Sequence, residues 1–362
     1  SKMYQLNFKL YQQDKTLLID KVLTSDNLQQ IPVGKHAYIN LITINIATPL
    51  PVEQQLSYDI CFIHEDVEQG LAELIPSLLY DKQALPFFVV KKKIMNMLHG
   101  SCRKPHFNSP DGLTAVDDLL VQINNQPDQQ TSISQRPAML MMSGDQIYAD
   151  DVAGPMLFGI HQVIKLLGLF DETLDDVLVN SSQELFDSPL CYYQRQHLLP
   201  QTIREKSLYH TFFSLSKKPI FTSANTNNHL VTFAEVIAMY LLVWSPELWA
   251  CIKLESALDN SIIKKEFHQR YCEELTIIND FSASLAKVRR SFAHLPVYMI
   301  FDDHDVTDDW NLTRGWEESA YGNPFSKQII GNALIGYWLC QGWGNAPEKF
   351  KLFNQQHVSD FT

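Results

Sequence analysis

The sequence predicts an α/β fold, because short apolar runs rich in β-forming residues alternate with stretches of helical periodicity. Three such runs, at 87–98, 138–142 and 296–301, each lead into polar or acidic residues. Ligands of α/β sheets bind at the carboxyl ends of the strands. The region before these runs has a different pattern. We therefore expect two domains, over residues 1–85 and 86–362.

Apolar and polar residues alternate in the amino-terminal region. Segments 4–10, 36–46 and 55–62 have the period of two that is typical of half-buried antiparallel strands. Turn-forming residues such as Pro32 and Gly34 separate them. The pattern predicts a small β-sandwich that gives structural support or shapes the substrate side rather than carrying chemistry.

Asp145 and Tyr148 follow the run at 138–142, which is expected to be a buried strand of a parallel sheet with Gly144 at its turn. A carboxylate and a phenol at one strand end suit a hard trivalent metal such as Fe(III). An aspartate can also bridge two cations about 3.5 Å apart. The alternative is that Asp145 is a turn residue and Tyr148 packs in the core.

Acidic residues cluster after the run at 296–301, together with one histidine: Asp302, Asp303, His304, Asp305, Asp308 and Asp309. Close carboxylates repel one another, so such a cluster needs cations or hydrogen bonds. We expect Asp303 and His304 to lie at a metal or phosphate site, where Asp302 could make a further contact. The alternative is the start of a helix that is capped by aspartate.

The run at 87–98 leads through Gly100 to Cys102 and Arg103. A Cys102 thiolate could join the same metal pocket, although a free cysteine is more often a small buried hydrophobe. Arg103 could bind phosphate through two hydrogen bonds, or it could form a structural ion pair with Asp145 or Asp150.

Helical patterns dominate residues 171–290, where we expect a large insertion that could cover the pocket. The patterns lie at 181–199, 232–244, 246–258 and 264–294. Aromatic residues of the insertion are expected to pack between helices: Tyr209, Phe212, Phe213, Tyr240, Trp244 and Trp249. Asn228 and His229 are candidates for a substrate or metal contact, although asparagine-rich loops ordinarily form turns.

The composition is that of a globular protein with an excess of acids. The 362 residues carry 41 acidic and 29 basic side chains, a net charge of −12, which argues against a nucleic-acid footprint. No apolar stretch reaches the 18 residues of a membrane-spanning helix. Six cysteines without a C-x-x-C pair indicate reduced thiols. With no visible export signal, we expect a cytoplasmic protein, and export stays open if the amino terminus is truncated.

Three blocks carry a family resemblance: 100–103 (GSCR), 144–150 (GDQIYAD) and 302–311 (DDHDVTDDWN). They resemble the PhoD-like phosphatases (alkaline phosphatase D family) of the calcineurin-like metallophosphoesterase superfamily, over roughly residues 90 to 320. The Gly-Asp-x-x-Tyr pattern is also similar to the iron-binding block of purple acid phosphatases.

The resemblance implies a metallophosphatase-type sheet packed by helices and a dinuclear site of Fe(III) and Ca²⁺, with Mn²⁺, Zn²⁺ or Mg²⁺ as alternatives. It implies that Asp145 bridges the metals, that Tyr148 and Cys102 bind iron, and that Asp303 is a further ligand. His304 would contact phosphate.

The implied activity is phosphodiesterase or alkaline phosphatase. A metal-activated hydroxide would attack phosphorus, with His304 as general acid and Arg103 on the phosphate. Asp305 is expected to raise the basicity of His304. One rival is a purple-acid-phosphatase-like or generic dinuclear phosphodiesterase that uses zinc or manganese. Another is a non-catalytic binding or scaffold protein.

The superfamily's last histidine-bearing block has no counterpart after Asn311, and His357 is the only later histidine. We therefore expect a missing C-terminal segment that carries the remaining ligands. The present chain is expected to bind metal weakly and to have little activity by itself.

Overall fold

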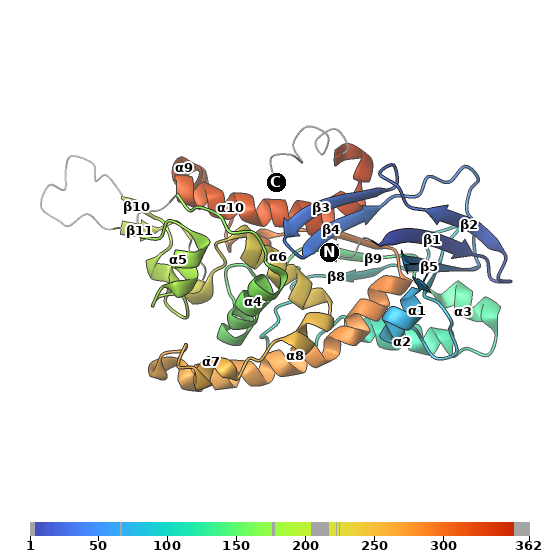
Figure 1. Ribbon diagram of the computed structural model, residues 1–362, viewed down its shortest axis with the longest axis horizontal. Helices are drawn as coiled ribbons and strands as arrows, with labels where there is room; N and C mark the ends of the chain where they lie inside the picture. Colours follow the sequence, from blue (N-terminus) through green and yellow to red (C-terminus); the bar gives the residue numbers. More distant parts are fainter. Residues whose placement is uncertain are drawn as a thin grey trace, which may run out of the picture.

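A computed structural model describes residues 4–65, 67–175, 178–203, 217–221, 223 and 225–350. The fold is mixed α/β, which confirms the predicted class. Figure 1 shows antiparallel strands at one end of the molecule, short central strands, and helices at the other end and along the sides. Tyr209, Phe212, Phe213 and His357 lie outside the described residues.

The antiparallel strands expected near the amino terminus form a five-stranded sheet. Its strands are β1 (Gln5–Tyr11), β2 (Leu17–Val22), β5 (Gln55–His64), β6 (Val67–Gln69) and β7 (Phe87–Val89), in the order β2-β1-β5-β6 with β7 also on β5. The run at 87–98 was expected to end in the Cys102 loop, but it is divided: residues 87–89 form β7 of this sheet, and only Leu98 belongs to the strand that precedes that loop. Short β6 pairs with only one end of β5, so β7 fills the edge left free at the other end.

A separate hairpin, β3 (Leu28–Gly34) and β4 (Ala37–Ile42), makes the second amino-terminal sheet. Its buried residues Ile31 and Val33 belong to the hydrophobic core that α4 (Gly154–Leu167) and α6 (Phe233–Trp244) build. The backbone N–H of Lys35 donates to the carbonyl of Gly168 just after α4, at 2.8 Å. The hairpin therefore packs on the helices rather than standing apart in a small sandwich.

The central sheet has three parallel strands in the order β12-β9-β8. They are β8 (Leu98–Gly100), β9 (Leu140–Ser143) and β12 (Val297–Ile300), which confirms the parallel strand predicted before Asp145. Leu140 and Met142 point to one face, where they pack with residues of α2 (Thr114–Asn124) and α8 (His268–His294). Because the strands are in register, their carboxyl ends share one edge.

Local signals account for the helix boundaries. Thr232 and Glu235 form a reciprocal capping box at the start of α6. The 27-residue α8 ends at His294, because Leu295 precedes Pro296 and takes an extended backbone. The single helix predicted over 181–199 is wrong: α5 (Ser182–Asp187) ends before Pro189, which cannot continue a helix.

The region 171–290 also contains a short hairpin, which the sequence did not predict: β10 (Gln201–Ile203) with β11 (Lys217–Pro219). The other helices are α1 (Leu71–Leu74), α3 (Gln129–Gln135), α7 (Ser256–Asp259), α9 (Arg314–Gly322), α10 (Pro324–Tyr337) and α11 (Trp343–Asn345). Short helical turns are η1 (Pro76–Leu78), η2 (Arg195–His197), η3 (Thr226–Asn228), η4 (Glu247–Cys251), η5 (Lys265–Phe267), η6 (Asp303–Asp305) and the π-turn η7 (Trp338–Gly342). Within the described ranges, no single helix has the length and apolar character needed to cross a membrane.

Candidate metal centre

A tight turn after β9 delivers Asp145 to the carboxyl edge of the central sheet. Gly144 has a φ of +120°, and a Cβ at this position would lie 2.4 Å from the Cβ of Asp302. Only glycine tolerates both the backbone conformation and the close approach. Asp145 follows with a φ of 50°, in the left-handed region. The turn thus brings the loops after β9 and β12 into contact.

Backbone hydrogen bonds tie the third loop to the same place. The N–H of Cys102 donates to the carbonyl of Gly144 at 3.3 Å, and the N–H of Arg103 donates to that of Asp145 at 3.1 Å. Cys102 also has a positive φ, 57°, and its side chain is exposed, so it is not the buried hydrophobe of the alternative interpretation. The loops after β8 and β9 are therefore fixed relative to each other.

Asp145, Asp303 and His304 converge, with one ligand atom of each lying within 4.8 Å of the other two. The Tyr148 hydroxyl donates to Asp145 Oδ2 at 3.3 Å, and its ring stacks on that of His304 with the centroids 4.5 Å apart. Cys102 lines the same cavity as Tyr148, and its Sγ lies 3.4 Å from Ser101 Oγ. The structure thus brings together five residues from the three loops that the sequence singled out.

His304 is oriented by Asp150, a residue that the sequence analysis did not place in the site. His304 Nδ1 lies 3.0 Å from each carboxylate oxygen of Asp150, which is completely buried. This hydrogen bond is the main reason that the pKa of His304 rises to about 9. Burial opposes ionisation of Asp150, yet the bond to His304 holds its pKa below the ordinary value. The sequence feature that could have identified Asp150 was its position at the end of the 144–150 block.

Asp305 was expected to raise the basicity of His304, and the structure contradicts this role. Its side chain is 1% exposed and accepts hydrogen bonds from the backbone N–H groups of Gln146, Ile147 and Asp302 at 3.1–3.3 Å. The Tyr240 hydroxyl, at 3.3 Å, is a further donor. Asp305 therefore holds the β9 loop against the β12 loop, because turn η6 directs its side chain into the protein.

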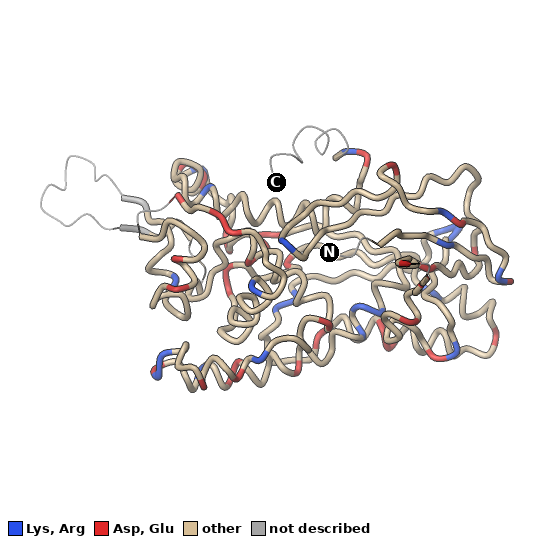
Figure 2. The backbone as a smooth tube through the Cα atoms, in the orientation of Figure 1, with Lys and Arg blue, Asp and Glu red and all other residues tan. Residues whose placement is uncertain are grey.

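A second acidic group shares one member with the first. Asp303, Asp308 and Asp309 also place one oxygen each within 4.8 Å of one another. Asp303 Oδ2 accepts from the N–H of Asp309 at 3.0 Å. Figure 2 shows this concentration of acidic residues along the chain between β12 and α9. Asp303, rather than Asp145, is the carboxylate common to the two groups.

Arg103 has protein partners for its whole guanidinium group. Nε and Nη2 donate to Asp111 at 2.8 and 2.6 Å, and Nη1 donates to the carbonyl of Val243 at 2.5 Å. The group also lies over the ring of Phe281, 4.8 Å from its centroid. The ion pair is thus with Asp111 rather than with Asp145 or Asp150, and this geometry favours the structural interpretation of Arg103.

Asn228 and His229 are completely buried outside the convergent cluster. Asn228 accepts from the N–H of Tyr193 at 2.6 Å and donates to the carbonyl of Val152 at 2.9 Å, so its amide fixes two loops. His229 Nδ1 bonds the carbonyl of Leu230 at 2.6 Å. Asp302 lies against Gly144, as described above, and belongs to neither acidic group among the described residues.

The donor set fits a cation. Asp145 is 4% exposed, and its Oδ1 has no hydrogen-bond partner among the described residues. Burial raises the pKa of Asp145, and nearby Asp303 adds to the effect, although the positive charge of His304 acts in the opposite direction. Burial and the Asp145 charge also raise the pKa of Tyr148. Carboxylates suit hard ions, and phenolate and thiolate suit iron.

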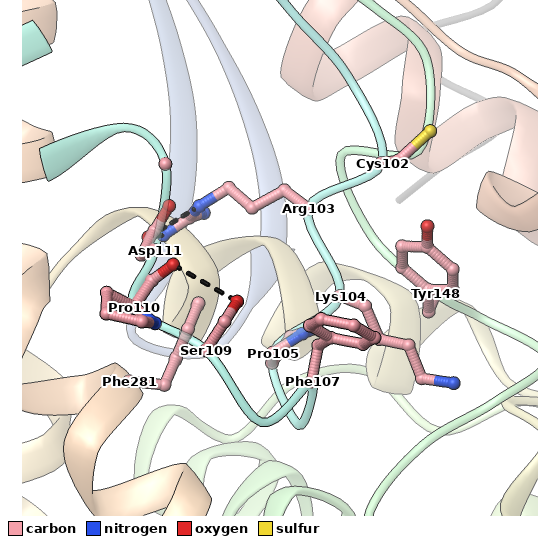
Figure 3. A pocket seen from close by; sticks show the side chains of 11 residues that line it. Cys102, Arg103, Lys104, Pro105, Phe107, Ser109, Pro110, Asp111, Tyr148 and Phe281 are labelled. Carbon is pink, nitrogen blue, oxygen red and sulfur yellow. Dashed lines mark hydrogen bonds and ion pairs between the residues drawn. The ribbon is translucent and has the colours of Figure 1, made fainter. Parts of the chain in front are cut away.

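A cavity of about 410 Å³ adjoins the cluster, with Cys102 and Tyr148 on the shared wall. Figure 3 shows the Tyr148 hydroxyl directed toward Cys102, and the ion pair of Arg103 and Asp111 on the opposite wall. Searches against protein-family models, curated proteins and solved structures each found no match. The family resemblance therefore depends on the three sequence blocks.

Proposed function

We propose that the protein is a metal-dependent phosphoric ester hydrolase of the PhoD-like type. The observation that carries the proposal is the convergence of Asp145, Asp303 and His304 within 4.8 Å at one sheet edge, beside Tyr148 and Cys102. Carboxylates, an imidazole and a phenol from two loops, with a thiol from a third, are the parts that a dinuclear phosphoesterase requires.

Asp145 and Asp303 would hold the cations, with Tyr148 and Cys102 on the iron side. Fe(III) with Ca²⁺ suits this mixture of donors, and Mn²⁺, Zn²⁺ or Mg²⁺ are the alternatives. Bound cations neutralise the charge of a phosphate ester and make hydroxide available near neutral pH. The unpartnered Oδ1 of Asp145 supports its assignment as a ligand.

His304 would donate a proton to the departing alcohol oxygen. Its Nδ1 is engaged by Asp150, which leaves Nε2 as the nitrogen available to a substrate. With a pKa of about 9, the imidazole is protonated near neutral pH, as a general acid must be. Asp150 acts through His304 by fixing its ring and favouring the charged form.

A second candidate is a protein that binds a cation without catalysis. It is favoured by the pairing of the nearest basic side chains: Arg103 with Asp111, and Lys104 with Asp151. No unpaired Arg or Lys lines the cavity beside the cluster within the described ranges. In a hydrolase, the cations themselves and His304 would then have to bind the phosphate.

Metal reconstitution followed by hydrolysis of bis(p-nitrophenyl) phosphate separates the two candidates. The hydrolase proposal expects turnover that depends on metal and falls by at least about 100-fold in His304→Asn, since general acid catalysis contributes roughly 10²–10⁴-fold. Asp26→Asn, at an exposed aspartate of the amino-terminal region, is the control and should keep full activity. Stoichiometric metal uptake without any turnover would instead support the cation-binding protein.

A further inference from the structure

The cavity beside the metal centre is large enough for an organic group. Its volume of about 410 Å³ lies within the range of small-molecule sites, roughly 300–1,000 Å³. The loop 104–112 forms one side, with Pro105, Phe107 and Pro110 facing the cavity, and Phe281 of α8 closes another. Tyr148 and Cys102, on one side of the cavity in Figure 3, also adjoin Asp145, so a group that extends from the metal centre would enter the cavity.

The charges of the cavity walls cancel in pairs. Arg103 is bound by Asp111 at 2.6 Å, and both side chains are almost completely buried. Lys104 is bound by Asp151, which also lies 3.2 Å from His106 Nε2. A ligand therefore meets neither a free cation nor a free carboxylate on the described walls. This arrangement favours an uncharged group over a second phosphate or a carboxylate.

One aromatic ring of the cavity is left open. The Tyr148 ring stacks on His304, and the Phe281 ring is covered by the Arg103 guanidinium. Phe107 is 62% exposed, and its ring makes no aromatic or cation–π contact with the described residues. An exposed phenylalanine at the mouth of a cavity offers a flat apolar surface on which another ring can stack.

We propose that this cavity binds a flat, uncharged aromatic substituent of a phosphate ester, which stacks on Phe107. The proposal names the substrate class of the metal centre. Its claim that the ligand is a phosphate ester rests on the proposed function. Its claim that the cavity binds an aromatic ring depends only on the cavity, the paired charges and Phe107.

Calorimetric titration with two phosphonates that cannot be hydrolysed tests the inference. 1-Naphthylmethylphosphonate carries the ring and methylphosphonate does not, and each is titrated into the 362-residue chain reconstituted with iron and calcium. We expect the naphthyl ligand to bind about 10-fold more tightly, as expected for one aromatic contact. Phe107→Ala should remove this difference and leave methylphosphonate binding unchanged. Phe170→Ala, at a phenylalanine that is 38% exposed outside this cavity, should preserve it.

Equal affinity of the two ligands for the unaltered protein, or no effect of Phe107→Ala on the naphthyl ligand, would overturn the inference. Its failure can be told apart from failure of the proposed function. Metal-dependent hydrolysis without a naphthyl preference refutes only the aromatic site. If the protein takes up no metal, saturation-transfer NMR with naphthylmethylphosphonate tests the aromatic site alone. A naphthyl-ring signal that is present with the unaltered protein and lost with Phe107→Ala supports the site. The absence of this signal with both proteins refutes it.

Discussion

Two clusters of the molecule place a buried carboxylate beside a histidine, and they differ in how many hydrogen bonds that carboxylate accepts. In the first, Glu235 Oε1 accepts from Arg195 at 2.7 Å and from His161 at 2.8 Å. Its Oε2 accepts from the backbone N–H groups of Val231 and Thr232 at 2.9 and 3.1 Å. Each carboxylate oxygen thus has two donors.

In the second cluster, the Asp145 side chain accepts one hydrogen bond, from the Tyr148 hydroxyl to Oδ2, and its Oδ1 has no partner among the described residues. The pKa values differ accordingly. Burial opposes ionisation of both acids, but Arg195 and His161 together outweigh it and lower the pKa of Glu235, whereas the pKa of Asp145 is raised.

The difference separates a structural cluster from a candidate site. A buried charge with a full set of donors stabilises one arrangement of the chain, and breaking it leaves an uncompensated partner. A buried carboxylate with an unused oxygen and acidic neighbours has room for a cation. Glu235 and Asp145 are both buried carboxylates beside a histidine, but only Glu235 has an arginine and a full set of donors, so hydrogen-bond saturation is the informative property.

The largest expected effect is on stability. Glu235→Ala leaves the completely buried Arg195 without its carboxylate, which should lower the free energy of unfolding by about 3–5 kcal/mol. Urea denaturation monitored by tryptophan fluorescence measures it. Glu273→Ala, at an exposed position of α8, should stay within about 0.5 kcal/mol. A similarly small effect of Glu235→Ala would break the comparison.

His294 extends the comparison to a satisfied histidine without an acid. Its Nδ1 accepts from the N–H of Phe87 at 3.3 Å, and Nε2 donates to the carbonyl of Leu78 at 2.9 Å. Burial lowers its pKa from 6.5 to about 4. The unfolded chain therefore binds a proton more readily than the folded chain between these values.

We expect this one group to lower stability by about 3 kcal/mol as the pH falls from 6.5 to 4, with no contribution to the slope above 6.5. Urea unfolding across this range should show a shallower slope in His294→Gln than in the unaltered protein. Exposed His36→Gln is the control. Parallel slopes in all three proteins would show that His294 is not held neutral.

Asp150→Asn tests how the candidate site controls its histidine. Removing the carboxylate should lower the pKa of His304 from about 9 toward the ordinary 6.5, because the hydrogen bond to Asp150 is the main cause of the raised value. NMR titration of the imidazole Cε1 proton in the metal-free protein measures this pKa. Asp26→Asn should leave it near 9. If His304 titrated identically in all proteins, Asp150 would have no positioning role.

The smallest expected effect concerns the phenol. Tyr148→Phe keeps the ring that stacks on His304 but removes the hydroxyl that faces Asp145. We expect iron affinity to fall by about 10-fold, with loss of any phenolate-to-iron charge-transfer absorption and little change in stability. Exposed Tyr38→Phe serves as control. Visible absorption during an iron titration checks the prediction, which an unchanged spectrum would contradict.

The sequence predicted the parts of the site that depend on strand ends. Apolar runs before Asp145 and before Asp303 form β9 and β12, and parallel pairing places their carboxyl ends together. Gly144 was expected at a turn, and the structure adds the reason, its close approach to Asp302. These features are local, so a sequence pattern can carry them.

Features set by the direction of a turn or by distant pairing could not be predicted. Asp150 and Asp305 are both acidic residues in short loops, and only the folded backbone decides that Asp150 faces His304 while Asp305 faces inward. Arg103 pairs with Asp111 because the loop between them folds back. Similarly, β7 pairs with β5 because β6 covers only one end of the β5 edge and leaves the other end free.

A count of bound metal ions tests the central claim most directly. The unaltered chain, Asp145→Asn and Asp26→Asn are each reconstituted with iron and calcium, freed of excess metal and measured by elemental analysis. The unused oxygen of Asp145 predicts that the unaltered chain and Asp26→Asn retain the same metal per chain, and that Asp145→Asn loses most of it without losing its fold. Equal metal content in all three proteins would contradict the assignment of this cluster as a metal centre.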